Sequence, residues 1–274
     1  MNRLNRTKQA QVVAALVEGN SINSIVRMTG VSKVTILKML ADLGPKCADY
    51  QDKNLRNLKC RRIQCDEIWQ FVYAKEKNVP ADKKGKFGYG DVWTWVAMDA
   101  DTKLIPAFTL GNRDGLTAKM FIDDLAAKLA TRVQLTTDGH KAYLNAVEGA
   151  FGCEVDYAML VKIYGPPQEE VRYSPAECLG TETKIITGSP DPEHISTSYI
   201  ERQNLTMRMT MRRFTRLTNG FSKKVENHAY SVALYTMHYN FCRVHKTLRV
   251  TPAMEAGLTD HVWTIEEMLD KVGL

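Results

Sequence analysis

The chain has no apolar run near the roughly 18–20 residues needed to cross a bilayer. Its first residues, Met1-Asn2-Arg3-Leu4-Asn5-Arg6, are not followed by the apolar segment of a secretory signal. These absences argue against membrane and secreted proteins, so we expect a cytoplasmic protein with no membrane partner. The charged fraction of 25% and hydrophobic fraction of 44% are those of a soluble globular protein, and 274 residues can bury a real core.

Cysteine is sparse, and no two cysteines form a Cys-x-x-Cys pair. The six thiols are too few for a disulfide framework in a chain of this length: Cys47, Cys60, Cys65, Cys153, Cys178 and Cys242. The first three are loosely grouped, but no fourth zinc ligand lies at an ordinary spacing. We therefore interpret the cysteines as scattered reduced thiols.

Positive charge is concentrated in two regions. The net charge of the chain is +6, yet residues 1–64 alone hold twelve Lys or Arg against four acids, and residues 200–250 hold ten against two. The segment between them is consequently acidic. Two basic regions around an acidic middle suggest a polyanionic partner, with metal-binding carboxylates placed between them.

The N-terminal region predicts three short helices, at 6–18, 22–29 and from Ser32 to about Leu43. Gly19-Asn20 ends the first helix, Ser21 and Ser32 are N-cap residues, and Gly44-Pro45 ends the third. This pattern resembles a helix-turn-helix unit over 1–45, whose last helix enters the DNA major groove. The candidate DNA contacts are Ser32, Lys33, Thr35 and Lys38. A helical bundle that only dimerises is the alternative.

From Ile63 the pattern changes to strands. Residues 46–62 are polar and charged and are interpreted as a linker or solvated helix. Strands are expected at 63–74, 91–99, 103–110, 132–137 and 153–160, the second and third as an antiparallel hairpin, with helices at about 116–131 and 140–150. We therefore predict an α/β catalytic domain over 63–250, with a mixed sheet flanked by helices, after an all-α N-terminal domain.

Residues 161–198 fit this layout poorly, because they are rich in Pro and Gly and contain one short strand candidate, at 184–187. We expect an irregular insert that either shapes or covers the functional site or lies at the periphery without a role in it. Helices at about 198–214 and 222–241 follow, and a helical tail occupies 251–274.

Three acidic residues in separate segments are the candidate catalytic and metal-binding groups. Asp66 lies within the first expected strand, Asp138 follows the fourth, and Glu201 opens the helix at 198–214. Aspartate is a poor strand former and its buried charge is costly, so its presence in a strand needs a reason. An oxygen-ligand cage for Mg²⁺ is such a reason, and paired divalent ions can catalyse phosphodiester chemistry.

The helix at 198–214 is also basic. Glu201, Asn204, Arg208 and Arg212 follow a spacing of three to four residues, so they share one face. The candidate DNA contacts on this helix are Arg202, Asn204, Arg208 and Arg212, because arginine recognises phosphate in a bidentate manner. A surface helix with internal ion pairs is disfavoured by the excess of arginine.

Two neighbours of these acids are expected to have lesser roles. Glu67 should point away from the metal, because adjacent strand residues face opposite sides of a sheet. His140 could protonate a leaving oxygen or contact phosphate, although packing or solvent exposure is the preferred interpretation.

The segments Ser196-Thr-Ser-Tyr-Ile-Glu-Arg-Gln-Asn-Leu-Thr-Met-Arg208 and Asn240-Phe-Cys-Arg-Val-His-Lys-Thr-Leu248, with those around Asp66 and Asp138, resemble bacterial insertion-sequence DDE transposases of the IS-one family. The resemblance covers roughly 60–250. It implies a ribonuclease-H-like core, the Asp66–Asp138–Glu201 triad, and action on terminal inverted repeats and target DNA as a homodimer or higher oligomer. His245 near the site is suggested by the resemblance alone. Some relatives carry an N-terminal cysteine zinc finger, which this chain lacks.

The predicted activity is metal-dependent DNA cleavage and strand transfer by phosphoryl transfer, with Mg²⁺ as the cofactor and Mn²⁺ able to substitute. A nucleoid-associated location would follow. The alternatives are a catalytically inactive repressor that binds DNA, and a ribonuclease-H-like nuclease without joining activity.

Overall fold

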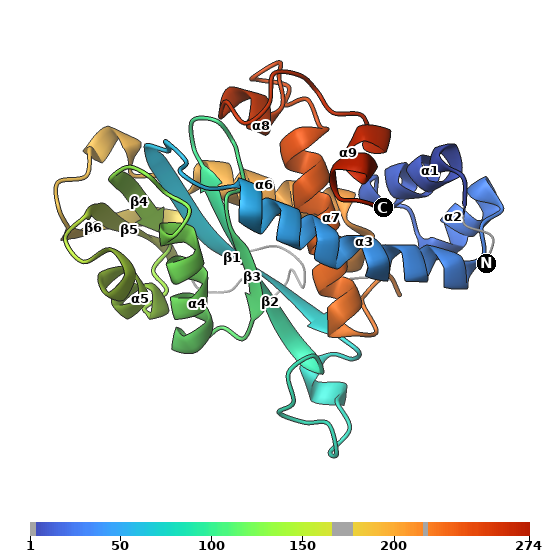
Figure 1. The fold of residues 1–274 in the computed structure, drawn as a ribbon. Helices are drawn as coiled ribbons and strands as arrows, with labels where there is room; N and C mark the ends of the chain where they lie inside the picture. The colour runs from blue at the N-terminus through green and yellow to red at the C-terminus, as the bar shows by residue number, and fades with distance from the viewer. Residues whose placement is uncertain (1–3, 166–177, 216–218) are drawn as a thin grey trace.

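A computed structural model describes residues 4–165, 178–215 and 219–274. Its N-terminal part contains α1 (Arg6–Val17), α2 (Ile22–Thr29) and α3 (Lys33–Asn54), as Figure 1 shows. The predicted caps are confirmed: Ser21 accepts a hydrogen bond from Ser24 N, and Ser32 from Thr35 N. The first two helices lie where the sequence predicted them.

The predicted end of the third helix at Gly44-Pro45 is wrong, because α3 continues through Pro45 to Asn54. Proline removes one backbone hydrogen bond from a helix, and tertiary packing compensates for it here. Gly44 lies against α7 (Val225–Phe241), where an added Cβ would come within 2.3 Å of Tyr230 Cβ. Gln51 Nε2 also donates to Ala233 O of α7. Part of the predicted linker is therefore a helix packed on α7.

A six-stranded sheet forms the centre of the molecule, with strand order β3-β2-β1-β4-β5-β6. Its strands are β1 (Arg62–Val72), β2 (Gly90–Asp99), β3 (Phe108–Gly111), β4 (Val133–Thr137), β5 (Val155–Tyr164) and β6 (Cys178–Thr187). β1 pairs antiparallel with β2 and parallel with β4, β4 pairs parallel with β5, and β2 pairs antiparallel with β3. The order of the first five strands, with β2 antiparallel, is that of a ribonuclease-H-like sheet, so the predicted fold class is confirmed.

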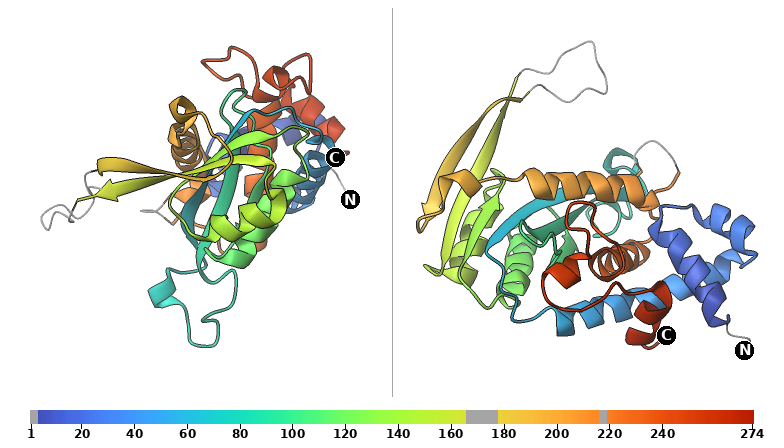
Figure 2. Two further views of the ribbon diagram at one scale, coloured as in Figure 1. Left: turned by 90° about the vertical axis from the view of Figure 1, so that its left-hand side faces the viewer. Right: turned by 90° about the horizontal axis from the view of Figure 1, so that it is seen from above.

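Helices cover both faces of this sheet. α4 (Gly115–Ala126) and α5 (Ala142–Phe151) lie on one face, and α6 (Ser198–Thr210) crosses the other (Figures 1 and 2). Successive residues of β1 point to opposite faces of the sheet. Cys65 packs in the hydrophobic core that includes α4 and α5, and Ile68 packs in the core that includes α6 and part of α7. The tail contributes the short helices α8 (Pro252–Glu255) and α9 (Ile265–Lys271).

The prediction of an irregular insert over 161–198 is wrong for much of its length. β5 extends to Tyr164, and β6 pairs with it antiparallel from Thr187 to Cys178. The two strands form a ribbon that projects from the body (Figure 2), and nearly all of β6 is exposed. A strand without a buried face shows no hydrophobic alternation, which explains why the sequence pattern missed it. Residues 166–177 of the expected insert lie outside the described residues.

The N-terminal helices share one continuous hydrophobic core with α4, α5, α7 and the sheet. The turn between α1 and α2 also touches the end of α6. Gly19 has φ +72°, and a Cβ there would come within 2.7 Å of Thr210 O. Only glycine therefore suits this close approach. In the part of the chain that the structure describes, no helix combines the length and apolar character needed to cross a bilayer.

Candidate active site

The pairing of β1 with β4 brings Asp66 and Asp138 together. β4 ends at Thr137, which lies opposite Cys65 of β1. Asp138 therefore follows directly on the strand end beside Asp66, and Gly139 continues the turn. Asp138 Oδ1 accepts a hydrogen bond from His140 N, and Asp66 Oδ1 accepts one from Glu67 N. Two residues far apart in the sequence thus meet at the point where β4 stops.

Two side chains of β1 fix the position of α6, which carries Glu201. Gln64 Oε1 accepts hydrogen bonds from Tyr199 N and Ile200 N, each at 3.0 Å, so a strand residue satisfies two amides in the first turn of the helix. One helical turn after Glu201, Asn204 Nδ2 donates to Asp66 Oδ2 at 2.8 Å. Glu201 lies between these two anchors and therefore faces the same region as Asp66.

The three predicted acids line one open cavity of about 680 Å³, together with Arg113, Lys141 and Lys162. Lys162 Nζ contacts Glu201 Oε2, and Thr197 Oγ1 donates to Glu201 Oε1. Lys162 belongs to the β5–β6 ribbon, so the ribbon supplies part of the wall. The structure thus brings Asp66, Asp138 and Glu201 together on one surface.

The tightest carboxylate group in the described residues consists of Asp66, Glu67 and Asp138, whose ligand oxygens all lie within 4.8 Å of one another. The prediction that Glu67 points away from this group is wrong. Glu67 lies on the α4–α5 face of β1, but β4 has already ended beside it, so its side chain can reach the space next to Asp138. Strand alternation separates two neighbours only where the sheet continues on both sides.

Arg113 links two of these acids. Its Nε donates to Glu67 Oε2 at 3.0 Å, and its Nη2 lies 3.3 Å from Asp138 Oδ2. The guanidinium also lies over the Trp93 ring, 4.9 Å from its centroid. The Glu67 side chain is 1% exposed, and its other oxygen has no hydrogen-bond partner among the described residues. The fully buried Tyr143 lies beside this carboxylate, and its hydroxyl lowers the pKa of Glu67.

The electrostatics of the cavity favour a cation. Burial, and then the charge of Asp138, raise the pKa of Asp66 to about 6 and that of Glu67 to about 7. Glu201 also raises the pKa of Asp66. Hard divalent ions such as Mg²⁺ take oxygen ligands. An all-oxygen donor set whose members repel one another therefore fits such an ion.

The two histidines differ in position. His140 lines the cavity, and its ring packs 5.7 Å from that of Trp95 and 6.1 Å from that of Tyr143. Burial, and then Arg113, lower the pKa of His140, which favours the neutral ring. His245 is not among the described residues that line the cavity.

The candidate DNA contacts of the first region lie at the start of α3. Ser32, Lys33 and Lys38 are exposed and Thr35 is half-buried. The hydroxyls of Ser32 and Thr35 lie 2.8 Å apart, and Ser32 Oγ also caps the helix. The two lysines are thus the members of this set whose charge faces solvent.

The candidate contacts of the second region have different surroundings. Arg202 and Arg212 are exposed, and Arg212 lies in the 3₁₀ turn Arg212–Phe214 after α6 ends, not on the face it was expected to share with Glu201. Asn204 is buried and holds Asp66, and Arg208 Nη1 donates to Trp69 O. Asn204 therefore serves the carboxylate site.

Three residues of the site were not identified from the sequence, namely Gln64, Arg113 and Lys162, and a fourth, Glu67, was predicted to point away from it. Gln64 could have been found, because it lies two residues before Asp66 and so shares its face of β1. Arg113 and Lys162 carry no local signal, since their role depends on how the strands pair.

Comparison with known proteins gives distant similarities. No protein-family profile and no curated protein matches the chain. A piggyBac transposase synaptic complex with hairpin DNA aligns over 99% of this chain and 71% of that chain, with 10% identity and a TM-score of 0.41. A Mos1 transposase paired-end complex aligns over 54% and 58%, with 15% identity and a TM-score of 0.23. A Mos1 mariner paired-end complex with Mn aligns over 86% and 77%, with 11% identity and a TM-score of 0.27.

These structural neighbours are transposases. Their low identities and TM-scores assign this chain to no family. Its function has to follow from its own residues.

Proposed function

We propose that this chain is a DNA transposase that cleaves and joins DNA strands with divalent metal ions held by Asp66, Asp138 and Glu201. The observation that carries the proposal is the meeting of these three acids, from β1, the end of β4 and α6, on one cavity. An open cavity lined by both acids and cations suits a metal ion bound against a phosphodiester.

Mg²⁺, or Mn²⁺ in its place, would supply a Lewis acid that activates the attacking oxygen and stabilises the leaving oxygen of a phosphodiester. The chain's own residues prepare this site. Asn204 orients the Asp66 carboxylate, and Gln64 holds α6 so that Glu201 faces it. Arg113, Lys141 and Lys162 line the same cavity and would bind the phosphate oxygens.

The finer assignment follows from the sequence. The segments around Glu201 and 240–248 resemble transposases of the bacterial IS-one family, which act on terminal inverted repeats as oligomers. The exposed Lys33 and Lys38 at the start of α3 support DNA binding by the N-terminal helices. We therefore propose that the chain binds element ends and target DNA as a homodimer or higher oligomer, at the nucleoid.

The experiment incubates the purified chain with the inverted repeats that flank its gene and a target duplex, in Mn²⁺, and sequences the products. We expect cleavage at the element ends and joining to the target. Cleavage without joining would support the nuclease alternative, and binding without cleavage would support the repressor. Asp138→Asn should retain DNA binding and lose cleavage; full cleavage by this variant would remove Asp138 from the site.

A further inference from the structure

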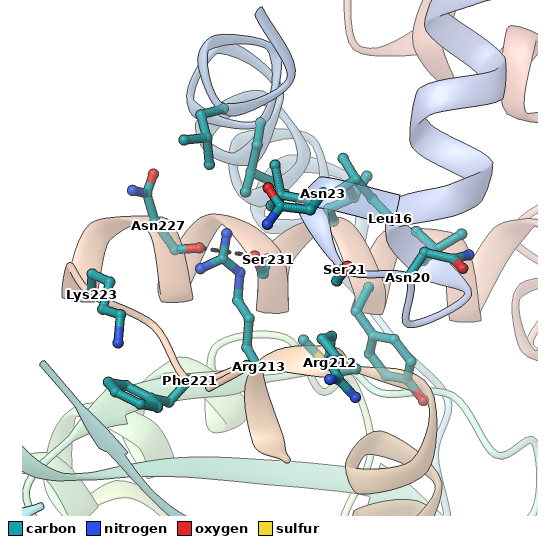
Figure 3. Close-up of a pocket in the computed structure, with 18 of the residues that line it drawn as sticks. Leu16, Asn20, Ser21, Asn23, Arg212, Arg213, Phe221, Lys223, Asn227 and Ser231 are labelled. Atoms are coloured by element: carbon teal, nitrogen blue, oxygen red, sulfur yellow. Dashed lines mark hydrogen bonds between the residues drawn. The ribbon is translucent and has the colours of Figure 1, made fainter. Parts of the chain in front are cut away.

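A second cavity, of about 430 Å³, opens between the N-terminal helices and the far end of α6. Its walls come from the α1–α2 turn, the start of α3, the 3₁₀ turn after α6, and α7 (Figure 3). It shares no lining residue with the carboxylate cavity. The two cavities are separate sites at opposite ends of α6.

Positive charge in this cavity is not balanced by acids. Five cationic side chains line what we call the basic pocket: Lys33, Arg212, Arg213, Lys223 and Lys224. None of its described lining residues is acidic. None of the five cations forms an ion pair with another described residue. A concave surface with charge of one sign attracts ligands of the opposite sign.

Arg213 has the surroundings of an anion-binding residue. It extends from the 3₁₀ turn toward Asn227 and Ser231 of α7, as Figure 3 shows. Its Nη1 donates to Ser222 Oγ at 3.1 Å, and this hydroxyl lies 3.1 Å from Nδ1 of His228, which is fully buried. Burial lowers the pKa of Arg213 to about 10. A desolvated guanidinium without a carboxylate partner costs free energy, which a bound anion would recover.

We propose that the basic pocket binds a backbone phosphate of the DNA, held by Arg213 and Arg212. That the anion belongs to DNA rests on the proposed function, whereas anion binding rests on the pocket alone. Lys33 occupies the first position of α3, so the pocket continues the surface predicted to contact DNA. Phosphate contacts of this kind position a duplex without reading its sequence.

The length of α6 sets the distance between the two sites. Glu201 lies in its first turn and Arg212 just beyond its last, eleven residues later, so they are separated by roughly 16 Å along the axis. Base pairs of B-DNA are about 3.4 Å apart along the duplex axis, so this length corresponds to about five base pairs. A duplex that reaches both cavities, with its scissile phosphate at the carboxylates, would place a phosphate about five base pairs away at the basic pocket.

The test compares Arg212→Gln and Arg213→Gln with wild type in binding to an element-end duplex. Lys119→Gln is the matched control, because it removes the same charge from exposed α4. Loss of a charge-assisted contact should raise Kd about 10-fold in each arginine variant and less than about 2-fold in the control. The slope of log K against log salt should become shallower by about one. Wild-type affinity and slope in both arginine variants would overturn the proposal.

Position is tested with duplexes that carry one uncharged methylphosphonate. Wild type should lose about 10-fold in affinity when this linkage lies about five base pairs from the cleavage site. The affinity of Arg213→Gln should be the same for this modified duplex as for the unmodified one. An equal additional loss in Arg213→Gln would show that the phosphate lies elsewhere and would overturn the proposal.

Free Arg213→Gln should be about as stable as wild type, because the change removes a half-buried charge that has no acidic partner among the described residues, at the loss of the hydrogen bond to Ser222. If this variant does not fold, Arg212→Gln decides, since Arg212 is exposed. A second measurement uses inorganic phosphate, which should raise the Tm of wild type and Lys119→Gln more than that of Arg213→Gln. Equal shifts in all three would overturn the anion site. If the protein binds phosphate but no duplex, both the claim that DNA occupies the basic pocket and the proposed function are overturned. If neither arginine change affects duplex cleavage, only the claim that the basic pocket binds DNA is overturned.

Discussion

Arg113 is the cation that connects Glu67 with Asp138, and its removal tests the geometry of the candidate site. Its Nε is 3.0 Å from Glu67 Oε2, and its Nη2 is 3.3 Å from Asp138 Oδ2. Glu67 Oε1 has no hydrogen-bond partner among the described residues. Arg113→Gln would therefore leave a carboxylate that is 1% exposed without its ion-pair partner.

The magnitude follows from the burial of the two partners. A hydrogen bond to a charged group contributes about 1.5–3 kcal/mol, and breaking a fully buried ion pair costs about 3–5 kcal/mol. The Arg113 side chain is 39% exposed, so water screens the pair. We expect Arg113→Gln to lower the free energy of unfolding by about 2 kcal/mol. The double variant with Glu67→Gln removes both charges, and the coupling energy of the cycle should be about 1–2 kcal/mol.

The assay is urea unfolding of wild type, both single variants and the double variant, followed by far-UV circular dichroism. EDTA keeps metal ions out of the comparison. A pH of about 8 keeps Glu67 ionised, since its pKa is raised to about 7. Arg113→Gln as stable as wild type, or a coupling energy of zero, would show that Glu67 does not depend on Arg113.

Three further changes test other parts of the account. Gln64→Leu should lower the free energy of unfolding by about 2 kcal/mol in urea titrations, because two helix amides lose their acceptor; unchanged stability would contradict this anchoring of α6. Asn204→Leu should change stability by less than about 1 kcal/mol, because its Oδ1 already lacks a partner, yet weaken Mn²⁺ binding to Asp66 about 10-fold in calorimetric titration; unaltered Mn²⁺ binding would refute its positioning role. Burial lowers the pKa of His228 to about 3, so below about pH 6.5 the unfolded chain takes up a proton that the folded chain does not. The free energy of unfolding should therefore fall by about 2 kcal/mol between about pH 7.5 and pH 5 because of this histidine. In His228→Gln the fall should be smaller by that amount. Parallel pH profiles of the two proteins would contradict the burial of a neutral imidazole.

Local signals were sufficient to predict most helices and strands. Ser21 and Ser32 are caps that act within one turn, and Gly19 ends α1 because its backbone is left-handed there. The first five strands of the sheet are rich in β-branched and aromatic residues, which the sequence shows directly. The error at Pro45 has a tertiary cause: the packing of Gly44 on Tyr230 lies outside anything the local sequence contains.

The sequence was sufficient to predict the acidic residues of the candidate site, but not the residues that contact and position them. An aspartate in a strand and another at a strand end are visible in the sequence, and parallel pairing of β1 with β4 brings them together. The position of Glu67 could not be predicted, because it depends on where β4 ends relative to β1. The same holds for Lys162, which reaches Glu201 only because β5 extends beyond the predicted strand.

Binding of Mn²⁺ tests most directly whether the three acids form one metal site. Calorimetric titration of wild type should show saturable binding, with affinity reduced at least about 10-fold in Asp66→Asn, Asp138→Asn and Glu201→Gln and unchanged in Lys119→Gln. Each variant should retain its circular dichroism spectrum, so that the loss reflects the ligand alone. Wild-type affinity in any of the three acid variants would contradict the account.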